Sequence, residues 1–106
     1  MPPRLTYSTA VVIQALAQGL RHGFDIIDAT GLQSGTVYPI LRRLEDAGLV
    51  RSRWESARAA RDEQRPPRRY YDLTADGAET VREAVRRYPA LPQALRAAPG
   101  AEPRRA

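Results

Sequence analysis

Apolar residues recur every three or four positions between Ser34 and Gly48, which predicts one amphipathic helix. The stripe expected to be buried consists of Val37, Ile40, Leu41 and Leu44. The opposite side is polar and cationic, with Gln33, Ser34, Thr36, Tyr38, Arg42 and Arg43. We expect Ser34 to cap the start of this helix and Gly48 to close its end in the left-handed conformation.

The segments on either side of this helix predict a winged helix-turn-helix. Asp25 to Thr30 is expected to form a short helix, with Gly31-Leu32 as a tight connection to the next one. In this arrangement the second helix enters the major groove of DNA. Two strands follow, Leu49–Glu55 and Arg68–Leu73, and the polar segment Ser56–Pro67 between them is expected to be a mobile loop. An ordinary helix of a small bundle is the alternative for the Ser34–Gly48 segment alone, but its neighbours disfavour it.

Three aromatic or imidazole side chains have structural explanations from the sequence. Trp54 is expected to anchor the wing with its ring buried, and stacking on an aromatic ligand is the alternative. His22 precedes the short helix and is expected to pack or cap rather than to bind a metal. Within that helix, Phe24 and Ile27 are expected to face the core.

The first and last helices both carry more apolar surface than a small domain normally hides. The first begins at Thr6 or Ser8 and ends near Gly19, and it is apolar on more than one face. The last begins at the cap Thr74 and is interrupted at Pro89. Pairing across a two-fold axis would bury both helices. The residues predicted at this dimer interface are Val12, Leu16, Val81, Val85, Tyr88, Leu91 and Leu95.

The fold class is therefore mainly α with a small β-wing (α+β), in the order helix, helix, helix, strand, strand, helix. We expect a flexible arm over residues 1–5 and a winged-helix domain over 6–73. A C-terminal dimerisation helix over 74–96 and a disordered tail over 97–106 complete the chain. A length of 106 residues fits one such domain.

Composition narrows the function. The chain has no cysteine, and no apolar run approaches the roughly 20 residues of a membrane span, so we expect a cytoplasmic protein without a membrane partner. The net charge is +5, and nine arginines stand against five acids between Arg42 and Arg69. A basic stripe in one part of a fold is typical of phosphate binding, although a solvated basic face has the same composition. No nucleophile–base pair or metal cluster is recognisable, so we expect no enzyme activity, metal or cofactor.

Double-stranded DNA is the partner that these features favour. The candidate DNA-binding residues are Gln33, Ser34, Thr36, Tyr38, Arg42 and Arg43, together with Arg58, Arg61, Arg65, Arg68 and Arg69 of the wing. Arginine can contact guanine or phosphate, and glutamine can contact adenine or phosphate. We expect the wing arginines to contact the flanking DNA backbone or the minor groove.

Two motifs make the sequence resemble a known family. The run from Gly31 to Glu45, which contains Gly-Thr-Val-Tyr-Pro, is followed by Gly48-Leu49-Val50, Trp54-Glu55 and Arg69-Tyr70-Tyr71-Asp72-Leu73-Thr74-Ala75-Asp76-Gly77. This pattern resembles the PadR family of transcriptional regulators. The resemblance implies a winged helix, a homodimer formed by the terminal helices, and repression through palindromic operators. By position it implies DNA contacts from Ser34, Thr36, Tyr38 and Arg42, and it supplies Pro39 inside a helix as a family feature.

The sequence departs from parts of the family pattern. It resembles the short members, which lack an additional C-terminal helical domain. Some short members bind planar aromatic drugs between subunits through a tryptophan on the last helix, and this chain has none there. A small apolar effector at the dimer axis remains an expectation. The alternative to operator binding is a winged-helix module for protein–protein or RNA contacts.

Overall fold

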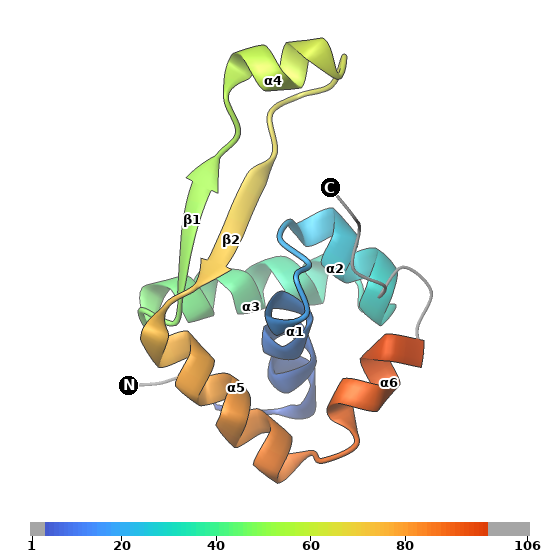
Figure 1. Ribbon diagram of the computed structural model, residues 1–106, viewed down its shortest axis with the longest axis vertical. Coiled ribbons are helices and arrows are strands. Elements are labelled where there is room, and N and C mark those ends of the chain that lie inside the picture. Colours follow the sequence, from blue (N-terminus) through green and yellow to red (C-terminus); the bar gives the residue numbers. More distant parts are fainter. Residues whose placement is uncertain (1–3, 98–106) are drawn as a thin grey trace.

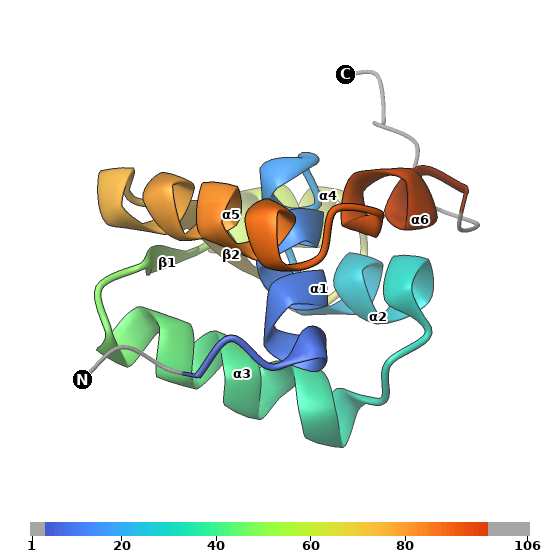
Figure 2. The ribbon, with the colours of Figure 1, turned by 90° about the horizontal axis from the view of Figure 1, so that it is seen from below.

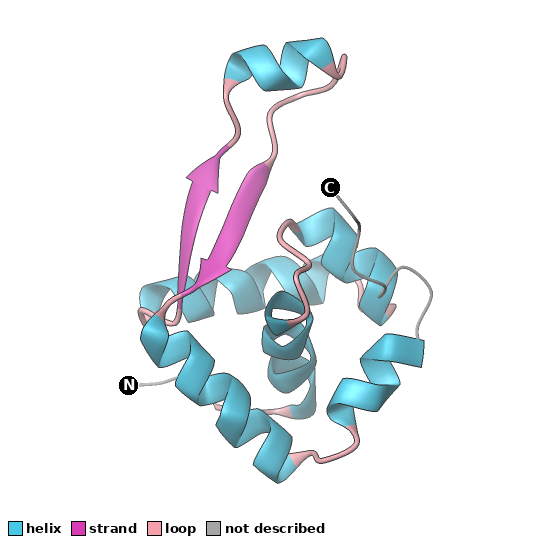
Figure 3. Ribbon diagram, in the orientation of Figure 1, coloured by secondary structure: helices cyan, strands magenta, loops and turns pink. Residues whose placement is uncertain are grey.

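The computed structural model describes residues 4–97 of the 106-residue chain and has the predicted winged-helix architecture (Figures 1 and 3). Its elements are α1 (Tyr7–Ala17), α2 (Gly23–Thr30), α3 (Ser34–Asp46), β1 (Val50–Trp54), α4 (Ala57–Asp62), β2 (Arg69–Leu73), α5 (Ala75–Arg87) and α6 (Leu91–Ala97). Two helices, α4 and α6, add to the predicted order. Most of the predicted arm (1–3) and tail (98–106) lies outside the described residues.

Helix α1 is the centre of the core. Thr6 caps it by accepting a hydrogen bond from the Thr9 amide, and all eight residues from Thr9 to Leu16 are buried. Helix α3 lies on one side of α1, and α5 and α6 lie on the other (Figure 2). A helix that is apolar nearly all round is therefore covered within one chain.

This packing corrects the reason given for a dimer. Four of the seven residues predicted at a dimer interface are already buried inside the single chain, namely Val12, Leu16, Leu91 and Leu95. The physical cause is α6, which turns back after Pro89 and packs on α1. The other three, Val81, Val85 and Tyr88, are half-buried, and Val81 and Tyr88 pack against the core.

Helices α2 and α3 form the predicted helix-turn-helix. Gly31 closes α2 in the left-handed conformation, with φ of +74°. The predicted apolar stripe of α3 is buried throughout. At its end the Leu49 amide donates to the Leu44 carbonyl (2.9 Å) and the Gly48 amide to the Glu45 carbonyl (3.0 Å), with Gly48 at φ of +77°. This pair of bonds is the Schellman motif, and it confirms the predicted role of Gly48.

Three expectations for these two helices are corrected or refined. The cap of α3 is Gln33 rather than Ser34, because the Gln33 carbonyl accepts the Thr36 and Val37 amides and Ser34 is already helical. Phe24 is exposed rather than buried, since the core face of α2 is set by Gly23, Ile26 and Ala29. Helix α3 continues through Pro39.

His22 is buried, as predicted from a packing role. Its ring meets the Tyr70 ring edge-to-face at 5.9 Å between centroids, and its Nε2 lies 2.9 Å from a carboxylate oxygen of Asp25. His22 precedes α2 without a side-chain cap bond.

The wing is a two-stranded antiparallel sheet in which Val50 pairs with Leu73, Ser52 with Tyr71 and Trp54 with Arg69. Directly opposite residues share a face of the sheet. We call the face formed by these six residues the inner face of the wing. The Tyr71 amide attaches β2 to the body by donating to the Arg21 carbonyl at 2.7 Å.

The wing also contains the two clearest failures of prediction. Trp54 is 65% exposed, not buried, because only the first two cross-strand pairs lie close to the body and the third projects beyond it. Residues 57–62 of the predicted loop form the helix α4 instead. Ser56 caps α4 by accepting from the Ala59 amide, and alanine has the highest helix propensity.

The junction between α3, the wing and α5 depends on a glycine. Thr74 donates to the Gly48 carbonyl at 2.7 Å and caps α5 at the Gly77 amide, and a Cβ at Gly77 would overlap the Leu49 carbonyl oxygen. We expect Gly77→Ala to destabilise the fold by about 2 kcal/mol or more, measured by urea unfolding. Gly35→Ala is the control, because a Cβ there meets open space and should change stability by about 1 kcal/mol or less. Equal unfolding midpoints for the two variants would contradict the close contact at Gly77.

Candidate nucleic-acid interface

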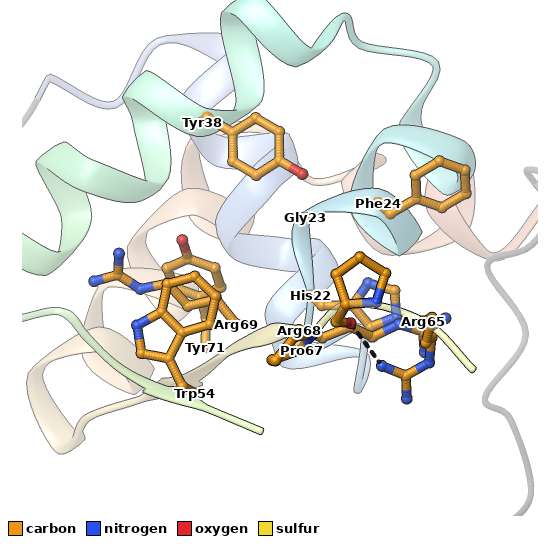
Figure 4. A pocket seen from close by; sticks show the side chains of 11 residues that line it. His22, Gly23, Phe24, Tyr38, Trp54, Arg65, Pro67, Arg68, Arg69 and Tyr71 are labelled. Carbon is orange, nitrogen blue, oxygen red and sulfur yellow. Dashed lines mark hydrogen bonds between the residues drawn. The ribbon is translucent and has the colours of Figure 1, made fainter. Parts of the chain in front are cut away.

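A groove separates α3 from the inner face of the wing (Figure 4). It consists of a larger hollow of about 860 Å³ and a smaller one of about 360 Å³, which share Tyr38, Arg69 and Tyr71. The larger hollow is lined by His22, Gly23, Phe24, Tyr38, Trp54, Arg65, Pro66, Pro67, Arg68, Arg69 and Tyr71. The smaller is lined by Tyr38, Arg42, Glu45, Asp46, Arg69 and Tyr71. The groove thus combines aromatic rings with guanidinium groups.

Tyr38 lies where the two hollows meet. Its side chain extends from α3 toward α2 and remains 46% exposed. Gly23 gives it room, because a Cβ at that position would overlap the Tyr38 ring. The close approach of α2 to α3 therefore depends on Gly23, and it holds the Tyr38 ring at the groove.

Arg69 connects the wing to α3. Its Nη2 donates to Glu45 Oε1 (3.1 Å) and to Ser52 Oγ (2.8 Å), and the Ser52 hydroxyl donates to Glu45 in turn. The same guanidinium lies 5.6 Å from the Trp54 ring centroid and 5.8 Å from that of Tyr71. Burial raises the pKa of the Tyr71 phenol above its ordinary value. Arg69 thus fixes the wing relative to α3 at the floor of the groove.

A second network holds the far end of the wing. Glu55 accepts hydrogen bonds from the Arg65 guanidinium, one of them at 2.7 Å, from the Arg68 amide at 3.3 Å and from the Tyr70 hydroxyl at 3.2 Å. The Arg65 hydrogen bond is the largest cause of a Glu55 pKa lowered to about 2. Arg65, one of the predicted DNA-binding residues, is thus already paired with Glu55 in the fold.

The remaining predicted residues are distributed over α3 and the wing. Those that line the groove are Tyr38, Arg42, Arg65, Arg68 and Arg69. Those on the rest of α3 or at its cap are Gln33, Ser34, Thr36 and Arg43, of which only Thr36 is half-buried. Arg58 and Arg61 are exposed on α4, at the end of the wing farthest from the body. The predicted residues therefore lie on two neighbouring parts of the fold, α3 with its cap and the wing with α4.

Several groove residues were not expected from the sequence. They are Phe24, Trp54, Tyr71 and Glu45. Alternation along β1 does place Trp54 on the same face as Val50 and Ser52. It does not indicate which residues of that face are covered by the helices.

The cations differ in how far the fold already neutralises them. Within the described residues, Arg65 and Arg69 are paired with carboxylates, whereas Arg42, Arg43, Arg58, Arg61 and Arg68 make no ion pair. In the same part of the chain, no group of three or more acidic, histidine or cysteine side chains could hold a metal, and no helix is long and apolar enough to cross a membrane.

Comparison with known proteins gives this geometry a family. The model of the PadR-like family of transcriptional regulators matches residues 12–83. The chain belongs to this family. The matched segment begins within α1 and ends within α5, so it includes α3, the whole wing and the groove between them. Membership makes the protein a DNA-binding transcriptional regulator by class.

Solved structures similar to the chain include the following two. One is a PadR-like transcription factor from Bacteroides fragilis, with 29% identity, a TM-score of 0.58, and coverage of 82% of this chain and 85% of that one. The other is smu.1704 from Streptococcus mutans UA159, with 23% identity, a TM-score of 0.58, and coverage of 85% of each chain; at this identity it supports the fold alone. No curated protein matches the chain.

The Glu55 network leads to a prediction for the wing tip. We expect Glu55→Gln to loosen α4, because an amide loses the charged pairing with Arg65, and trypsin should then cleave faster after Arg58 and Arg61 at pH 7. Hydrogen exchange of the α4 amides should show the same difference from wild type. Since the Glu55 pKa is lowered from 4.5 to about 2, that difference is present above pH 4.5 and disappears as the pH falls toward 2.

Glu79→Gln is the matched control. Arg82 lowers the pKa of Glu79 in the same way, but that exposed pair lies along α5 and far from the wing tip in sequence. Equal protection of α4 in both variants would contradict the role assigned to Glu55.

Proposed function

We propose that this PadR-like regulator is a transcriptional repressor that binds a palindromic operator as a homodimer, through α3 and the wing. The observation that carries the proposal is the groove, in which the polar side of α3 is turned toward the inner face of the wing and toward Arg65 and Arg68 beside it. A convex helix beside a projecting hairpin is suited to two adjacent grooves of a duplex.

The contacts follow from which side chains are free. With α3 in the major groove, the unpaired Arg42 and Arg43 reach guanine or phosphate, and Gln33 at the helix start reaches adenine or phosphate. The wing then extends along the flanking DNA, where Arg58 and Arg61 on α4 approach the backbone or the minor groove.

The dimer is supported by a different part of the surface. Val81 and Val85 on α5 and Tyr88 at its C-cap recur at three- and four-residue spacing and stay half-buried in one chain. A second copy packed on this stripe would complete their burial. A two-fold axis at this interface would relate the α3 helix of one protomer to the α3 helix of its partner. Two such helices about 34 Å apart, one turn of DNA, match a palindrome.

A second function is favoured by one observation. Phe24 and Trp54 are large, exposed aromatic residues in an arginine-lined groove, and such surfaces also stack bases of single-stranded RNA. That function predicts tighter binding to single strands than to duplexes and no palindromic footprint. Selection from random duplexes, run beside selection from random RNA, distinguishes the two.

The recognition helix gives the direct test. We expect Arg42→Ala/Arg43→Ala to weaken binding to the selected duplex about tenfold or more and to reduce the slope of log K against log salt by up to about 2. The control is Arg86→Ala/Arg87→Ala, which removes two adjacent exposed arginines from α5. Gel-shift titrations that move equally for the two double variants would remove α3 from the interface.

Light scattering tests the dimer. We expect the wild-type mass to be twice that of one chain, and Val85→Arg to halve it because a charge would have to be buried at the axis. A wild-type protein that stays monomeric at tens of micromolar would contradict the homodimer.

A further inference from the structure

We propose that Trp54 is a DNA-contacting residue whose indole packs against a deoxyribose of the backbone strand that separates the two grooves. This inference rests on the proposed function and adds to it a residue that the sequence assigned to the core. It concerns an apolar contact, in contrast to the arginine contacts above.

The exposure of Trp54 is the first observation. Tryptophan offers one of the largest apolar surfaces of any side chain, yet 65% of this residue is open to solvent. Its two predecessors on the inner face are covered: Val50 is 3% exposed, and Ser52 is hydrogen-bonded to Glu45 on α3. Trp54 is therefore the first residue on the inner face of β1 that lies beyond the contact between the wing and the body.

The indole is also held in place. Arg69 lies opposite it across the strand pair, with its guanidinium carbon 5.6 Å from the ring centroid, and Arg69 is itself bonded to Glu45 and Ser52. An aromatic ring fixed before binding loses little conformational entropy on contact. The Trp54 ring is thus a preorganised surface at the groove.

The position of the Trp54 ring indicates which part of a DNA duplex it would contact. Trp54 and Tyr38 line the same hollow from the wing and from α3 (Figure 4). If α3 enters a major groove and the wing the adjacent minor groove, the sugar–phosphate strand between those grooves must pass through this hollow. Bases inside a duplex are stacked on each other, so the deoxyribose is the apolar group within reach of the ring.

Charge complementarity supports a backbone strand. The described residues that line the larger hollow include Arg65, Arg68 and Arg69 and no carboxylate. Arg68 makes no ion pair within the described residues. A sugar–phosphate strand alternates an apolar ring with an anion, and the hollow places an aromatic ring beside cations. We infer that the sugar meets Trp54 and that Arg68 meets the neighbouring phosphate.

Because Trp54 is the single tryptophan, its fluorescence reports the contact directly. The wild-type protein is titrated with the duplex obtained by selection, and quenching by acrylamide is measured free and bound. We expect the bound protein to be quenched several-fold less efficiently than the free one. The same measurement at a salt concentration that abolishes the gel shift should return the value of the free protein.

Variants separate the apolar contact from a charge effect. We expect Trp54→Ala to weaken duplex binding about tenfold with an unchanged salt slope, and Trp54→Phe to recover most of the loss. Arg68→Ala is the contrasting variant, because it should lower the slope by about 1. Urea unfolding of each variant shows whether the fold is retained. If Trp54→Ala does not fold, the quenching measurement on the wild-type protein still decides.

The outcomes distinguish this inference from the function on which it rests. A protein that shifts the duplex normally while Trp54 stays fully accessible, or a folded Trp54→Ala variant that binds like wild type, overturns the inference and leaves the repressor proposal standing. Protection of Trp54 by an added planar aromatic compound and not by duplex also overturns it. Failure of the wild-type protein to bind any duplex overturns both.

Discussion

The connection between Glu45, Ser52 and Arg69 is the interaction on which the geometry of the groove depends. These three residues come from α3, β1 and β2, so a single set of hydrogen bonds fixes a hairpin relative to a helix. A two-stranded hairpin has marginal stability by itself and needs packing partners. Here the core supplies them only as far as Val50, Leu73 and Tyr71, and beyond that point the polar connection takes over. This connection, together with the hydrogen bond from the Tyr71 amide to the Arg21 carbonyl, holds the wing in place beside α3.

Local chemistry explains what the sequence could predict. The stripe of α3, the left-handed Gly48 and the Thr74 cap each depend on residues within one turn, so spacing and side-chain type suffice. The exposure of Trp54 depends instead on where the body ends, which is a property of the packed chain. The inner-face alternation of β1 is the same whether the third pair is covered or bare. For that reason the sequence predicted the face of Trp54 correctly and its burial wrongly.

The two unexpected helices have different origins. Helix α4 is local in origin, since Ser56 caps an alanine-rich segment, and the arginines and prolines nearby concealed that signal. Helix α6 is tertiary in origin: its Leu91 and Leu95 are buried near α1, and the Gln18 side chain donates to the Pro92 carbonyl at 3.2 Å. This packing buries the α1 and α6 residues of the predicted dimer surface within one chain. The half-buried stripe of α5 is what remains of it.

Paired and unpaired arginines contribute to phosphate binding at different distances. Between Arg42 and Arg69 the balance is nine arginines against five acids, a net +4, and internal pairs leave that sum unchanged. At distances longer than an ion pair, the electrostatic attraction of this region for a polyanion depends on its net charge. At contact only an unpaired guanidinium can replace the counterions of a phosphate without breaking a bond, and Arg53, Arg65 and Arg69 are paired. The paired arginines therefore shape the groove and add to long-range attraction. The unpaired ones, which include Arg42, Arg43, Arg58, Arg61 and Arg68, are the candidates for the proposed contacts.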